Sequence, residues 1–249
     1  MNKVKVLDHG FVETCEIFGN DYTILESARV STGGVASKSD KQDRGLIRYL
    51  YKNNHSSPFE QVVVRLHIKC PIFVMRQWVR HRTQSLNEYS GRYSKMIEEY
   101  YIPENFKYQS EDNHQGSSGP LPEIENNEIR SKTIENSEKS HGLYNKLLEA
   151  KVSKEQARIV LPINQYTEFY TTMNLWNLFH LLHLRLHKHT QWETQQFAIA
   201  IFELLKKEDK IKWSMEIFSE KNELDYLYLD AISKCKDLSK LKEYLGKFE

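Results

Sequence analysis

Four arginines gather within a short stretch of this 249-residue chain, among side chains that form directional hydrogen bonds. They are Arg76, Arg80, Arg82 and Arg92, and their neighbours include Gln77, Ser85, Asn87, Glu88 and Ser90. Each guanidinium is a rigid fork of donors that fits a phosphate, and serine and asparagine add neutral hydrogen-bonding groups. Cations at the end of a helix also suit the negative end of the helix dipole without any ligand. The density of directional side chains favours a site for a small molecule that carries phosphate.

Four histidines form a second group: His180, His183, His187 and His189. At helical spacing the first three share a face, where they could bind zinc, pack in the core or contact an anionic cofactor. No acidic residue or cysteine has matching spacing, so we expect no metal site and favour the cofactor contact. Arg185 lies among the leucines of this segment, and a buried guanidinium is costly unless it is paired. We therefore expect a buried partner or a ligand for Arg185.

Motifs of several other enzyme classes are missing from the sequence. There is no glycine-rich dinucleotide motif or phosphate-binding loop, which disfavours a Rossmann or Walker site, and no Gly-x-Ser-x-Gly elbow of a hydrolase. No residue next to Cys15 or Cys70 would lower the pKa of a thiol. The segment from His55 to Glu60, taken alone, is typical of an ordinary turn. No enzyme nucleophile is obvious.

The hydrophobic pattern predicts the elements that must position these groups. Strands are expected at Val4–Leu7, Phe11–Phe18 and Gln61–Cys70. Helices are expected at Asp21–Val30, Asp40–Lys52, Pro71 to the Arg80–Arg82 cluster, Leu143–Ala150, Ser153–Val160, Glu168–His187 and Thr190–Lys206. Strands followed by helices predict an α+β fold, a small antiparallel sheet packed with long helices in a single domain over residues 1–249. Within it, 105–142 is expected to be a polar, partly mobile insertion and 224–249 a helical tail.

Composition narrows the classes of function. Lys+Arg 35 against Asp+Glu 34 gives a net charge of +1, which argues against a nucleic-acid binder, because such domains usually carry a basic excess. The apolar runs are too short to span a bilayer, and the first residues lack the pattern of a signal peptide. We therefore expect a cytoplasmic protein without nucleic-acid or membrane partners.

Four sequence blocks together resemble one enzyme family. The segment Arg80–Tyr93 resembles the signature Arg-His-Arg-x-x-Ser-x-Asn-Glu-x-Ser-x-Arg of flavin-dependent thymidylate synthases, and every fixed position is filled. His55–Glu60 is similar to the family's His-x-(Ser/Thr)-Pro-Phe-Glu block, and Ala157–Pro162 to its Ala-Arg-x-x-Leu-Pro block. Asn174–Glu193 is similar to its late helix. The resemblance covers the chain from about Lys3 to Lys206.

The resemblance implies reductive methylation of dUMP to dTMP. Methylenetetrahydrofolate would supply the carbon, NADPH the electrons, and FAD would carry the hydride, without a covalent bond between enzyme and substrate. Members of the family are homotetramers whose sites combine residues of several subunits. A different flavin- or nucleotide-binding oxidoreductase on the same scaffold is the alternative.

The positions that match the family's motifs imply a ligand for each candidate site residue. The residues implied for dUMP are Gln77, Arg80, Glu88, Ser90, Gly91, Arg92, Arg158 and Arg185. Those implied for FAD are Ser57, Arg80, His81, Arg82, Glu88, Asn174, His180 and His189. His55, Tyr93 and Ser31 would lie near the flavin or folate. Arg185 resembles the arginine that favours ionisation at uracil N3, so we expect it to be catalytic by stabilising the developing anion.

Two positions depart from the family pattern. Trp176 stands where some members carry a basic residue, so a cofactor contact there would be through the backbone. His180 stands where other members have asparagine, which keeps a polar contact but alters its pH dependence.

Overall fold

The structure is a computed structural model that describes residues 2–34, 39–111, 114–187 and 189–222. Its strands are β1 (Lys3–Val6), β2 (Gly10–Phe18), β3 (Val63–Pro71), β4 (Gln84–Glu88), β5 (Lys107–Gln109), β6 (Ser117–Pro120) and β7 (Tyr166–Asn174). Its α-helices are α1 (Asp21–Val30), α2 (Asp40–Lys52), α3 (Ile72–Trp78), α4 (Glu123–Glu149), α5 (Lys154–Ala157), α6 (Leu175–Arg185), α7 (Trp192–Leu205) and α8 (Lys212–Lys221). Short 3₁₀ turns are η1 (Phe59–Gln61), η2 (Arg158–Val160) and η3 (Asp209–Ile211).

Five strands form one antiparallel sheet in the order β1-β2-β3-β7-β4. β7 comes late in the chain and lies between β3 and β4, so that Thr171 pairs with Leu66 on one side and with Leu86 on the other. This insertion brings the segment after α3 next to the segment before α6. The predicted α+β class with a small antiparallel sheet is confirmed.

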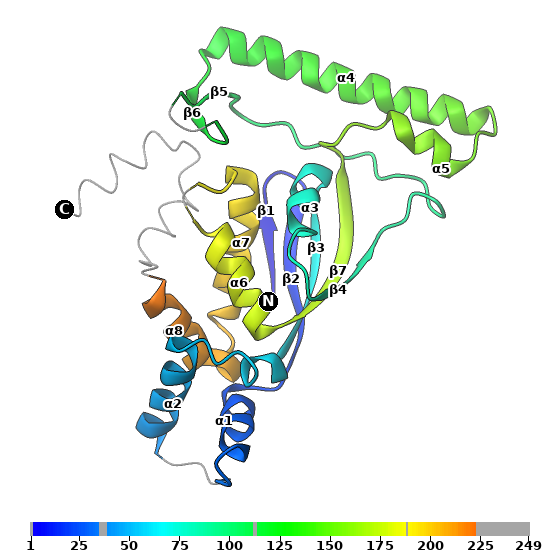
Figure 1. Ribbon diagram of the computed structural model, residues 1–249. Coiled ribbons are helices and arrows are strands. Elements are labelled where there is room, and N and C mark those ends of the chain that lie inside the picture. Colours follow the sequence, from blue (N-terminus) through cyan, green and yellow to red (C-terminus); the bar gives the residue numbers. More distant parts are fainter. Residues whose placement is uncertain (1, 35–38, 112–113, 188, 223–249) are drawn as a thin grey trace.

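One face of the sheet supports the core. Along β3, Val64, Leu66 and Ile68 are fully buried, whereas Arg65, His67 and Lys69 lie on the other face, as the alternation predicted. Helices α6 and α7 lie beside the sheet in Figure 1, and their leucines, isoleucines and phenylalanines belong to the same core cluster.

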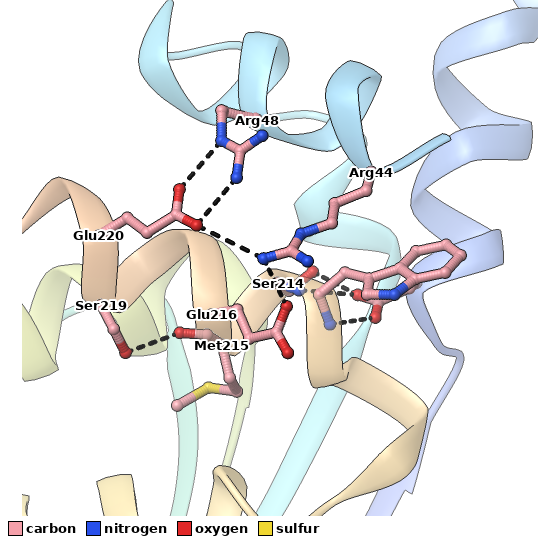
Figure 2. Close-up of polar contacts among 9 residues, drawn as sticks. Arg44, Arg48, Ser214, Met215, Glu216, Ser219 and Glu220 are labelled. Atoms are coloured by element: carbon pink, nitrogen blue, oxygen red, sulfur yellow. Dashed lines mark hydrogen bonds and ion pairs between the residues drawn. The ribbon is translucent and has the colours of Figure 1, made fainter. Parts of the chain in front are cut away.

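Helices α1, α2 and α8 lie at one end of the sheet, and α4 and α5 lie at the opposite end (Figure 1). The buried Asp21 of α1 caps α8, because its carboxylate accepts the backbone N–H groups of Trp213 (2.7 Å) and Ser214 (3.1 Å). Figure 2 shows the ion pairs between α2 and α8: Arg48 Nε donates to Glu220 at 2.9 Å, and Arg44 lies 2.8 Å from Glu216. Helix α8 was not predicted.

The helix predicted for Glu168–His187 is wrong at both ends. Residues 166–174 form β7, whose burial alternates along threonine, phenylalanine and tyrosine side chains that favour strands. The helix begins after Asn174, whose side-chain oxygen accepts the N–H of Asn177 at 2.9 Å. It ends at Arg185, so His187 and His189 lie beyond it.

The helix predicted to begin at Leu143 instead begins at Glu123, inside the expected polar insertion. α4 is polar around most of its surface, and Glu128–Lys132 and Glu135–Lys139 are exposed ion pairs at i,i+4 spacing. Tyr144 is fully buried on its inner face. The expected mobility of 105–142 stays a prediction, and the tail at 224–249 lies outside the described residues.

Membrane-spanning helices and clusters of metal ligands are both absent from the described residues. No helix there is long and apolar enough to cross a membrane. No group of three or more potential metal ligands comes together there either.

Candidate functional site

We expected a buried partner or a ligand for Arg185, and the structure shows that a histidine is its partner. At the end of α6, its Nε donates to Nε2 of His81 at 2.8 Å, and a terminal nitrogen lies 3.5 Å from the backbone oxygen of Gln77. His81 follows α3, which begins after the N-capping Pro71 and is fixed to the core by the buried Trp78. We call Gln77, His81, His180 and Arg185 the Arg185 cluster.

The electrostatics of this cluster keep His81 neutral. Burial, followed by the charges of Arg185 and His180, lowers the pKa of His81 to about 4. The His180 ring lies 6.3 Å from the His81 ring. A neutral imidazole can accept the Arg185 hydrogen bond and leaves the positive charge of the guanidinium uncompensated. Burial also lowers the pKa of Arg185.

The turn from α3 into β4 is conformationally unusual. Thr83 has a φ of 63°, in the left-handed region that a β-branched residue rarely occupies. Gln84 fixes the turn: its side-chain oxygen accepts from Trp78 Nε1 (3.1 Å) and Thr171 Oγ1 (2.7 Å), and its nitrogen donates to the backbone oxygen of His81. Arg80 and Arg82 are exposed on this turn, and neither forms an ion pair within the described residues.

A second group of predicted residues lines a small pocket at the far end of β4. The pocket has a volume of about 180 Å³, and its lining includes Glu88, Gly91, Arg158, Gln165 and Thr167. Thr167 Oγ1 donates to Glu88 Oε1 at 2.7 Å, which orients the carboxylate. We call this the Glu88 pocket.

Gly91 lies directly against the wall of this pocket. A Cβ at this position would lie 2.3 Å from Met96 Sδ and 3.1 Å from Arg158 Cδ, so any side chain would displace the pocket wall. The adjacent Ser90 accepts the backbone N–H of Arg92 at 3.3 Å. Arg92 itself pairs with Glu155 of α5 at 3.1 Å, with both side chains more than half exposed.

The structure separates the predicted dUMP residues into these two groups. β4 spans five residues, so its ends lie about 13 Å apart at the rise of an extended strand. Gln77 and Arg185 lie at its beginning, whereas Glu88, Gly91 and Arg158 lie at its end. The two groups are therefore separate within the described part of one chain, and we treat them as two candidate half-sites.

The other predicted residues are dispersed. His55 and Ser57 are exposed between α2 and η1, Ser31 is exposed at the end of α1, and Tyr93 is 77% exposed beyond β4. Asn174 caps α6 with its side-chain oxygen, so its amide group is oriented by the helix start. His189 lies after α6, with its ring 5.0 Å from that of His187. The expectation that His180, His183 and His187 share one helical face is wrong, because α6 ends at Arg185 and His187 lies beyond it. His183 contacts Asn222 after α8.

Three glutamines at these sites were not predicted. Gln84 occupies a variable position of the signature yet fixes the turn between the two groups. Gln191 accepts a hydrogen bond from Gln77, a member of the Arg185 cluster. Gln165 is fully buried behind the Glu88 pocket and donates to the backbone oxygen of Ile97. Of the three, only Gln191 could have been found from the sequence, because it lies in the segment that resembles the family's late helix.

Known proteins resemble this chain over most of its length. A family model described as "Thymidylate synthase complementing protein" matches residues 15–209. A flavin-dependent thymidylate synthase of Thermus thermophilus is 47% identical over 211 residues, which cover 85% of this chain and 77% of that protein. One of Thermotoga neapolitana is 44% identical over 216 residues, covering 87% and 94%.

A solved structure has the same fold. The UMP/dUMP methylase PolB of Streptomyces cacaoi, bound with 5-Br dUMP, superposes with a TM-score of 0.78 at 28% identity, covering 87% of this chain and 97% of that chain. The family match spans the Arg185 cluster and the Glu88 pocket. By this match and the identity of its relatives, the chain belongs to the thymidylate synthase complementing protein family.

Proposed function

We propose that this chain is a flavin-dependent thymidylate synthase. It converts dUMP to dTMP, with methylenetetrahydrofolate as carbon donor, FAD as hydride carrier and NADPH as reductant. The observation that carries the proposal is the half-buried Arg185, whose protein partner is a neutral histidine. Its charge is therefore available to an anionic ring. The names of the curated relatives and the dUMP analogue in the related methylase support the same substrate.

The chain offers a donor set that fits FAD. The exposed Arg80 and Arg82 provide two cations without carboxylate partners in the described residues, which suits a diphosphate. Ser57, His81, Asn174, His180 and His189 provide further polar groups on other elements of the chain. When bound, FAD supplies hydride transfer.

The Glu88 pocket fits the phosphate and sugar of a nucleotide. Arg158 supplies a cation. The missing side chain of Gly91 leaves room for Met96 and Arg158 in the wall of the pocket. Glu88 supplies a carboxylate that can accept from a sugar hydroxyl, with its position fixed by Thr167. Ser90 and Arg92 border this pocket in sequence and add donors.

Arg185 provides the electrostatic catalysis. A guanidinium fixed against the uracil ring stabilises negative charge that develops at N3 and C4 oxygen, and favours the ionised ring. His81 accepts from Nε of Arg185, and the backbone oxygen of Gln77 lies 3.5 Å from Nη2, which leaves Nη1 to donate to the uracil ring. The absence of a covalent nucleophile is consistent with the described thiols, since burial raises the pKa of Cys70 well above its ordinary value and also raises that of Cys15.

The complete site needs more than one subunit. The two half-sites lie at opposite ends of β4, and dUMP must contact both. We propose a homotetramer in which the Arg185 cluster of one subunit faces the Glu88 pocket of another.

The direct test measures dTMP. Purified protein is mixed anaerobically with FAD, NADPH, dUMP and methylenetetrahydrofolate, and dTMP is quantified by chromatography. The proposal predicts a yellow protein and dTMP that depends on every component. A protein that stays colourless with added FAD would refute it. Bound FAD without dTMP would favour a different flavin oxidoreductase.

A further inference from the structure

Helix α8 contacts α1 and α2, the two helices that precede the predicted site residues Ser31 and His55. The family match ends at residue 209, before α8 begins. Its first turn is capped by Asp21 of α1. Its middle forms ion pairs with α2 through Glu216 and Glu220 (Figure 2). Its last residue, Lys221, and the following Asn222 contact the end of α2.

The end of α2 is a turn that depends on one left-handed residue. Asn54 has a φ of 57°, a conformation that costs energy for residues other than glycine and is tolerated best by asparagine. The N–H of Asn54 donates to Tyr51 O at 3.2 Å, and the N–H of His55 donates to Leu50 O at 2.9 Å. These two bonds form a Schellman motif, so Asn54 sets the direction in which His55 leaves the helix.

Lys221 binds this motif at two points. Its Nζ donates to Tyr51 O and to Asn54 Oδ1, both at 3.3 Å, and lies 4.8 Å from the centre of the Tyr51 ring. A cation at the C-terminus of a helix stabilises the exposed carbonyl groups. The contact to Asn54 Oδ1 also holds the side chain of the left-handed residue itself.

Asn222 extends the connection to α6. Its amide nitrogen donates to the hydroxyl of Tyr51 at 3.3 Å, and its oxygen is hydrogen-bonded to Nδ1 of His183. One turn earlier on α6, His180 belongs to the Arg185 cluster. The end of α8 therefore joins the α2 turn to the helix that carries Arg185.

The segment that leaves this turn has little freedom of its own. Only His55–Pro58 separate the turn from η1, where Phe59 is fully buried against Trp176 and Phe179. The backbone oxygen of Ser56 accepts the N–H of Phe59 at 2.9 Å. Because the far end is fixed in the core, the direction set at Asn54 determines where His55 and Ser57 lie.

From these contacts we infer that Lys221 is a positioning residue for the flavin site. By capping α2 and holding Asn54 in the left-handed conformation, it directs His55 and Ser57 to the cofactor. The inference rests on the proposed function, since it takes FAD as the ligand of this segment.

A matched set of variants tests it. Lys221→Met removes the cap and keeps the length of the side chain. Arg44→Met removes contacts between the same two helices without touching the turn. Asn54→Gly, made in the Lys221→Met background, supplies the left-handed residue at no conformational cost. FAD affinity is measured by fluorescence titration, and protection of the His55 amide by hydrogen exchange without FAD.

We expect Lys221→Met to weaken FAD binding about fivefold and to speed exchange of the His55 amide, while Arg44→Met behaves as the wild type. Asn54→Gly should restore both properties. Wild-type affinity and exchange in Lys221→Met, equal losses in Lys221→Met and Arg44→Met, or no rescue by Asn54→Gly would overturn the inference. A wild-type protein that binds no FAD would instead refute the proposed function, and with it the flavin role of Lys221.

Discussion

The arginines at the α1–α2–α8 end of the molecule and those at the candidate site have different partners. At the α1–α2–α8 end, Arg29 pairs with the buried Asp43, and Arg44 and Arg48 pair with Glu216 and Glu220. At the candidate site, Arg80, Arg82 and Arg158 have no carboxylate partner within residues 2–34, 39–111, 114–187 and 189–222, and Arg185 bonds to a neutral histidine.

This difference distinguishes structural from ligand-binding arginines. A carboxylate of the protein beside Arg185 would neutralise the charge that an anionic substrate needs, whereas His81 orients the guanidinium and adds no charge. Arg92 is intermediate, because its pair with Glu155 is exposed on both sides and can exchange for a phosphate at little cost.

The largest effect is expected at the structural end. Asp43→Ala leaves Arg29 buried without its carboxylate, and should lower the free energy of unfolding by about 3–5 kcal/mol. Urea denaturation measures the loss, with Arg44→Met as the exposed control. A loss of similar size in both variants would mean that the buried Arg29–Asp43 pair contributes no more to the free energy of unfolding than the exposed pairs of Arg44.

Arg185→Ala should impair turnover and leave the stability of the fold nearly unchanged. We expect kcat to fall about 100- to 1,000-fold because an electrostatic contact to the reacting ring is lost. Flavin content and the unfolding midpoint should change little. Both quantities are measured on the same preparation by absorbance and thermal denaturation. Loss of flavin would show that Arg185 holds the cofactor and does not act on the uracil ring.

Arg158→Met should affect substrate binding more than turnover. Removing one charge-assisted contact to phosphate should raise the KM for dUMP about 10- to 100-fold, with kcat nearly unchanged. Deoxyuridine, which lacks the phosphate, provides the control, since its weak binding should not depend on Arg158. An equal loss for both ligands would place the phosphate elsewhere.

The smallest effect is a pH dependence at His81. Its pKa of about 4 in the folded protein lies below the ordinary value of 6.5, so the unfolded chain takes up the proton first as pH falls. The contribution to stability is therefore present above pH 6.5 and is lost as pH falls towards 4. Denaturant unfolding of the wild type and His81→Gln across this range should converge at the acidic end. Parallel curves would contradict a neutral His81.

Local patterns predicted much of this fold. Alternation identified β3, and periodicity identified α1 and α2 with the bounds that the structure has. The helix prediction for residues 168–174 was wrong because their apolar side chains fit both periods, and only the neighbours β3 and β4 decide for a strand. The first part of α4 was not predicted because it has no continuous apolar stripe, and its buried positions include the polar Asn126, Ser137 and His141.

The sequence predicted which residues belong to the candidate site, but it did not predict how they are arranged. The signature identified Arg80–Arg92, but the bond between Arg185 and His81 joins positions far apart in sequence. Gln84 fills a variable position, so its role depends on the fold alone. The separation of Gln77 and Arg185 from Glu88 and Arg158 follows from the length of β4, a strand that the hydrophobic pattern did not predict.

The most direct test of the account is subunit complementation. Arg185→Ala and Arg158→Ala impair the two half-sites separately. Equal amounts are unfolded, mixed and refolded together, and dTMP formation is assayed at a dUMP concentration far below the KM of the Arg158 variant. If each site combines the Arg185 cluster of one subunit with the Glu88 pocket of another, random assembly should restore about a quarter of the wild-type rate of dTMP formation. Refolded single variants set the baseline. A mixture that remains as inactive as the single variants would show that both half-sites act within one chain.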